Sequence, residues 1–117
     1  MPRDSLTDQS TRDPPLPYAG CMPSFRVTVT IGALRPGTRP ESVLPAAARA
    51  AGELTTVEAS DLAIVSGMPR ITVRFTADGA GSAMQIGQHV VASTSSLAEA
   101  LAWKVTERVK GRWHLIR

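Results

Sequence analysis

Residues 62–76 read LAIVSGMPRITVRFT and predict a β-hairpin. After the turn, Ile71, Val73 and Phe75 alternate with arginines and threonines, so apolar side chains lie on one face and polar ones on the other. The same alternation runs upstream, and residues 67–69 provide the break between the two runs. The hairpin therefore contributes two neighbouring strands, each with one buried and one exposed face.

The composition is that of a single small domain. The chain has 117 residues, of which 43% are hydrophobic and 4% aromatic, so aliphatic side chains must fill the core. The lone cysteine, Cys21, cannot form an intramolecular disulfide, and no Cys and His cluster has metal-ligand spacing. We expect no cofactor. A cytoplasmic location is expected because one cysteine fits a reducing compartment and no apolar run approaches the ~20 residues of a membrane helix.

Residues 1–21 form a proline-rich segment that we expect to be a disordered tail ahead of one domain at 22–117. The motif DPPLPY in this tail includes a P-x-x-P pattern that suits polyproline II, although such patterns arise readily in proline-rich tails. Met22 stands directly before the first strand and offers an alternative start of the chain.

The segment 25–34 has the cleanest alternation in the chain and predicts the first strand. Its inward residues are apolar: Phe25, Val27, Val29 and Ile31. A turn at 35–38 follows, and Ser42 is expected to cap a helix that runs to Ala51 and stops at Gly52. Alanines give this helix a narrow face that suits close packing on a sheet.

The segment 53–60 leads into the hairpin, with a β-bulge expected near 59–61. After the hairpin, apolar residues at helical spacing predict a second helix over 80–93. The sequence GAG at 79–81 resembles a phosphate-binding turn, but Asp78 would repel a phosphate. We interpret these residues as a loop and helix cap.

Residues 97–110 carry two competing patterns. A capping box and an i, i+4 stripe of Leu and Val are typical of a helix. Alternation of apolar with polar residues predicts instead a strand that turns at 110–111 into a last strand at 112–116. We favour the hairpin because β-branched residues are frequent and Trp103 and Trp113 would pair across it. The lysine in the turn argues against it, because lysine suits a left-handed conformation poorly.

The resulting order is strand, helix, strand, strand, helix, strand, with an added C-terminal strand. It predicts an α+β fold of the ferredoxin-like βαββαβ type, an antiparallel sheet with both helices on one face. The other face would be open and rich in arginine, lysine and threonine, with no acidic residue among them and both tryptophans on the helix side. The predicted binding surface consists of Arg26, Thr28, Arg70, Thr72, Arg74, Lys104 and Arg108.

Three hypotheses compete for the function of this face. A binding or interaction module that self-associates through the open face, giving a homodimer or larger homo-oligomer, requires least. Weak electrostatic binding of RNA or DNA is the alternative, since basic residues outnumber acidic ones from Arg70 onward. The same residues also suit a plain solvated sheet face.

An enzyme is the remaining alternative, and we favour a binding module over it. Dimeric α+β barrels include cofactor-free oxygenases and isomerases, which gives an analogy from fold alone. His89 and His114 are the side chains that titrate near neutrality. No nucleophile elbow, phosphate loop or carboxylate pair accompanies them, so no catalytic residue is assigned.

Overall fold

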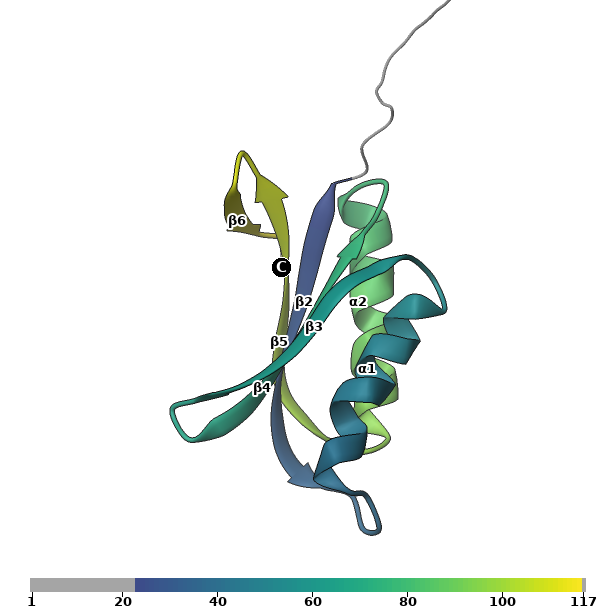
Figure 1. Cartoon of the computed structure of the whole chain (residues 1–117), viewed down its shortest axis with the longest axis vertical. Helices are drawn as coiled ribbons and strands as arrows, with labels where there is room; N and C mark the ends of the chain where they lie inside the picture. The colour runs from purple at the N-terminus through teal and green to yellow at the C-terminus, as the bar shows by residue number, and fades with distance from the viewer. Residues whose placement is uncertain (1–22, 117) are drawn as a thin grey trace, which may run out of the picture.

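The computed structural model describes residues 23–116 as a five-stranded antiparallel sheet with two helices (Figure 1). In chain order the elements are strand β2 (Ser24–Leu34), a 3-10 turn η2 (Pro40–Ser42), helix α1 (Val43–Gly52), strands β3 (Val57–Val65) and β4 (Met68–Thr76), helix α2 (Ala80–Ser95), and strands β5 (Ala98–Val109) and β6 (Arg112–Leu115). The α+β class is confirmed. The tail with its DPPLPY motif, Cys21 and Met22 lies outside the described residues.

Strand β2 lies at the centre of the sheet, whose order is β3-β4-β2-β5-β6. It pairs with β4 on one side and with β5 on the other, and both pairings are antiparallel. Both helices lie on the same side of the sheet, and the β5–β6 hairpin curls toward the opposite side (Figure 1). The sheet therefore has one covered face and one open face.

The alternation in β2 and β4 determines which side chains enter the core. Phe25 is opposite Phe75, and their rings stack at 6.1 Å between centroids. Val27 is opposite Val73 on β4 and Val105 on β5. Because directly opposed residues in antiparallel strands point to the same face, these side chains form one continuous layer. All five are fully buried, and a side chain of this kind contributes about 1.5–3 kcal/mol when removed from water.

Small residues let the helices approach this layer closely. Helix α1 contributes three buried alanines, Ala47, Ala50 and Ala51. In helix α2, a Cβ built on Gly87 would lie 2.7 Å from Cγ2 of Val105 and 3.5 Å from the ring of Trp103. Only glycine fits at that point without displacing the side chain of Val105.

The helices do not cover the whole hairpin formed by β3 and β4. Helix α1 has ten residues and spans about 15 Å, whereas the nine residues of β3 span about 30 Å. The far end of the hairpin extends away from the two helices (Figure 1). Leu62 and Ile64 lie on the helix side of the sheet. Because no helix covers this end of the hairpin, their side chains remain 48% and 65% exposed.

The hairpin turn differs from the predicted one. It consists of Ser66 and Gly67, both with positive φ, as in the two-residue turns that match strand twist. Met68 and Pro69 are residues of β4 rather than part of the turn. Proline is tolerated there because the pairing of β4 with β2 begins only at Arg70, so no hydrogen bond from residue 69 to β2 is lost.

Residues 98–115 form the predicted hairpin rather than a helix. Its turn places Lys110 at φ 52° and Gly111 at φ 79°, so lysine does occupy a left-handed position. The predicted pairing of the two tryptophans is wrong. Trp103 is opposite Val29 on β2, whereas Trp113 is opposite Arg108 on β5.

Smaller differences concern element ends. Ser42 makes no side-chain cap, because the 3-10 turn η2 precedes α1, and Gly52 is the last residue of that helix rather than its stop. Helix α2 extends to Ser95. The irregularity in β3 falls between Val57 and Ala59, close to the predicted bulge. Within residues 23–116, neither helix has the length and apolarity that a membrane crossing requires.

Replacing Gly87 by alanine tests the close approach of α2 to the sheet. We expect the Gly87→Ala variant to lose about 1–3 kcal/mol of unfolding free energy in urea, because the added methyl group overpacks the core against Val105.

Gly81→Ala is the matched control in the same helix, since a Cβ there meets nothing within 4 Å. Its stability should stay level or rise by up to about 1 kcal/mol through helix propensity. Equal stability of the two variants would contradict the packing described for Gly87.

Candidate functional site

The face of the sheet opposite the helices, called the open face below, brings together every residue of the predicted binding surface. Arg26 is opposite Arg74 on β4 and Thr106 on β5. Thr28 is opposite Thr72 and Lys104. Arg70 and Arg108 continue the same alternation along β4 and β5. The side chains of the predicted surface therefore share one face, and three neighbouring strands position them.

Trp113 also lies on the open face, contrary to the prediction that it faces the helices. Its partner Arg108 points to this face, and directly opposed residues share a face. The expectation that both tryptophans lie on the helix side is right for Trp103 and wrong for Trp113. If the pairs are counted outward from the two-residue turn, residue 109 is opposite 112 and residue 108 is opposite 113. This count, which needs only the sequence, would have placed Trp113 on the open face.

Three arginines surround the indole ring of Trp113. The guanidinium carbon Cζ of Arg26 lies 4.0 Å from the ring centroid. The corresponding distances are 5.5 Å for Arg74 and 6.0 Å for Arg108. Each contact is within the range of a cation–π interaction, which contributes about 0.5–1 kcal/mol at exposed sites. Arg26 reaches the ring from two strands away, across β5.

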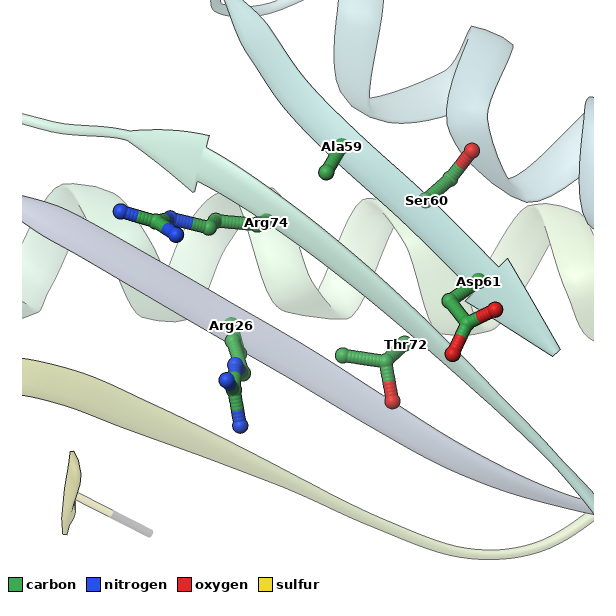
Figure 2. Close-up of a pocket in the computed structure, with 6 residues that line it drawn as sticks. All are labelled: Arg26, Ala59, Ser60, Asp61, Thr72 and Arg74. Carbon is green, nitrogen blue, oxygen red and sulfur yellow. The ribbon is translucent and has the colours of Figure 1, made fainter. Parts of the chain in front are cut away.

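Strand β3, which the predicted surface did not include, brings acidic residues to the edge of the open face. Oε1 of Glu58 accepts a hydrogen bond from Nε of Arg74 at 2.9 Å and another from the hydroxyl of Ser24 at 2.9 Å. Asp61 is opposite Thr72. Figure 2 shows Asp61, Thr72 and Arg26 pointing to the same side of the sheet, and Ser60 pointing away from them. The open face is thus acidic along β3 and basic where β4, β2 and residues 104–108 of β5 lie together.

A shallow hollow of about 380 Å³ lies in the middle of the open face. Its lining combines cations, threonine hydroxyls and two apolar side chains at one end: Arg26, Thr28, Arg70, Thr72, Lys104, Thr106, Trp113 and Leu115. Thr28 is buried at its base, while Lys104 is exposed. A ligand in this hollow contacts cationic side chains, threonine hydroxyl groups and the aromatic ring of Trp113.

The two histidines lie elsewhere and apart from the hollow. Nε2 of His89, on α2, contacts Oε1 of Glu53 at 2.8 Å, and both side chains are exposed. His114, on β6, is opposite Glu107 and exposed. Neither lines the hollow of the open face. Among residues 23–116 there is also no group of three or more His, Cys, Asp or Glu side chains that would hold a metal ion.

Comparison of the chain with protein-family models, with curated proteins and with solved structures found no match.

The turn at Lys110 and Gly111 sets the register of β6 against β5 and so places Trp113 on the open face. A residue that adopts positive φ more readily than lysine should stabilise this turn. We expect Lys110→Asn to protect the amides of the β5–β6 hairpin more strongly from hydrogen exchange, because asparagine adopts positive φ at lower cost than lysine. The gain should correspond to roughly 1 kcal/mol of local opening free energy.

Lys110→Gln is the matched control, since it removes the same charge without favouring positive φ. Equal protection in the two variants would mean that charge rather than backbone conformation limits the hairpin.

Proposed function

We propose that this protein binds single-stranded nucleic acid, RNA or DNA, on its open face. The observation that carries the proposal is the position of Trp113, with the guanidinium carbon of Arg26 4.0 Å from its ring centroid, within a basic sheet face. Proteins that bind single strands combine a positively charged surface for the backbone with aromatic rings for the bases. Both parts lie within the same hollow.

The phosphate part of the proposal rests on the arginines and lysine of β2, β4 and β5. Lys104 and Arg108 are exposed on β5, and Arg70 lines the hollow from β4. Among the described residues, the ion pair on this face joins Arg74 to Glu58 and involves neither Lys104 nor Arg108. Threonine hydroxyls beside the cations suit donation to phosphate oxygens or contact with a 2′-hydroxyl.

The base part rests on Trp113 and Arg26. The guanidinium of Arg26 lies over one face of the indole ring, so a base stacks on the outer side of this guanidinium or on the ring surface that remains. Such stacking tolerates any base. Leu115, exposed on the same side of β6, extends this surface. The sequence predicted only weak electrostatic binding. The proposal adds stacking of bases on Trp113 and Arg26.

Self-association of two open faces is less well supported. A two-fold contact brings the same patch of both copies together, so the cations of one copy would face those of the other. Like charges across an interface oppose association. An enzyme of the dimeric α+β barrel type has less support again, since His89 and His114 do not share the hollow of the open face.

We also propose that the domain belongs to the ferredoxin-like folds, with β6 as an added strand. Two observations support this proposal. The helices and strands follow one another in the βαββαβ order, and β2, the first described strand, lies between β4 and β5 in the sheet. A cytoplasmic location is proposed with it, on the single cysteine of the chain.

Fluorescence anisotropy with a labelled single strand of about twelve nucleotides tests the nucleic-acid proposal. Binding should weaken as salt rises, because phosphate contacts release counterions. Trp113→Leu should weaken binding by roughly 5- to 150-fold at fixed salt, the equivalent of about 1–3 kcal/mol of stacking. A duplex of the same sequence should bind less tightly, because its bases are not free to stack.

Two matched variants distinguish phosphate contacts on the open face from an effect of the net charge of the protein. Arg108→Gln should reduce the slope of log K against log salt by about 0.7, the value of one single-strand phosphate contact. Arg49→Gln removes an exposed arginine from α1 and should leave the slope unchanged. Absence of binding at low salt, or equal effects of the two variants, would overturn the proposal.

A further inference from the structure

Strand β3 forms one edge of the sheet and is open to a further strand. It has nine residues, all exposed except the half-buried Val57. The opposite edge strand, β6, has only four. Alternate backbone N–H and C=O groups of an edge strand point away from the sheet, and a long exposed edge is a template for pairing.

The second half of β3 is apolar as well as exposed. Leu62 and Ile64 are 48% and 65% exposed on the helix side, and Val65 is 37% exposed. Leu62 and Ile64 also border an apolar groove of about 370 Å³, which extends to Val43 and Leu44 on α1. The edge and the groove together form one apolar strip at the end of the sheet that the helices leave uncovered.

We propose that two copies of this chain pair through β3, antiparallel and edge to edge, about a two-fold axis at Ala63. The interface runs along the β3 edge and includes Arg70 and Asp61 from the border of the open face. The proposal does not rest on nucleic-acid binding.

The register follows from the side chains of β3. Centred on Ala63, the pairing sets Leu62 opposite the partner's Ile64, and Ile64 opposite the partner's Leu62, on the helix side. A register centred on Asp61 would oppose the two Asp61 carboxylates, which is unfavourable. One centred on Leu62 would set Ile64 opposite the partner's Ser60. The hydrophobic pattern fixes register in sheets with one buried face, so the Ala63 register is preferred.

Charge complementarity supports a second copy as the occupant. In the Ala63 register the partner's Arg70 lies two strands across from Ala63, and Asp61 is two residues along β3 from Ala63. Arg26 and Trp113 have this same relation within the chain, and the guanidinium of Arg26 reaches the Trp113 ring. In this register Asp61 is opposite the partner's Val65, and the two small Ala63 side chains lie between Asp61 and the partner's Arg70. Each copy thus offers a cation and a carboxylate to the other, symmetrically.

The pairing would join two sheets into one of ten strands. A two-fold axis perpendicular to the sheet keeps both pairs of helices on one side and both open faces on the other. The two basic faces then flank a central strip that carries the acidic residues of β3.

Disulfide trapping tests the register directly. The experiment uses the full chain with Cys21→Ser and Ala63→Cys, and oxidation should yield a covalent dimer. Across the two-fold axis the two Cα atoms would be about 4.5–5.5 Å apart, which suits a disulfide. Ala59→Cys is the matched control, since it lies on the same strand and face. Its two copies would be about 27 Å apart and should not cross-link.

Sedimentation equilibrium provides the second readout. The chain with its native β3 should have the mass of two chains at high micromolar concentration, and Leu62→Lys should have the mass of one. Leu62 is half exposed, so this change leaves the core intact. A monomeric native chain, cross-linking of the Ala59→Cys control, or a dimer that persists in Leu62→Lys would overturn the proposal. Loss of nucleic-acid binding with the dimer retained would count against the proposed function alone.

Discussion

The pairing of β2 with a strand on each side is the constraint on which the rest of the structure depends. Because side chains alternate along a strand, this double pairing aligns the alternation of β4 and β5 with that of β2. Phe25 and Val27 then lie under the helices, and Arg26 and Thr28 lie on the open face. A shift of one residue would bury the arginines and expose the core, so core and candidate site are fixed by the same register.

The sequence was sufficient to predict the order of the elements and the face on which each residue of β2 and β4 lies. Period-two alternation is strong in 25–31 and 70–76, and no helical pattern competes with it there. The hairpin at the C-terminus was harder to predict, because the stripe of Leu and Val fits a helix equally well. What decided it is the pairing of β5 with β2, a contact between distant parts of the chain.

Two features of the open face depend on long-range geometry that patterns in the sequence do not show. The face of Trp113 depends on the turn at Lys110 and Gly111, which fixes the register of β6 against β5. The acidic edge depends on the irregularity between Val57 and Ala59, after which Asp61 is on the same face as Thr72. The exposure of the hairpin end has a different cause, since it follows from the short length of α1 relative to β3.

The chain has two tryptophans, one on each face of the sheet, and this makes one measurement decisive. The indole N–H signals of Trp103 and Trp113 in an NMR titration report on the covered and the open face separately. Addition of a single-stranded oligonucleotide should shift the Trp113 signal and leave that of Trp103, which packs beneath α2, in place. A shift of Trp103 alone, or no shift of either signal at saturating oligonucleotide, would contradict the assignment of the open face as the binding surface.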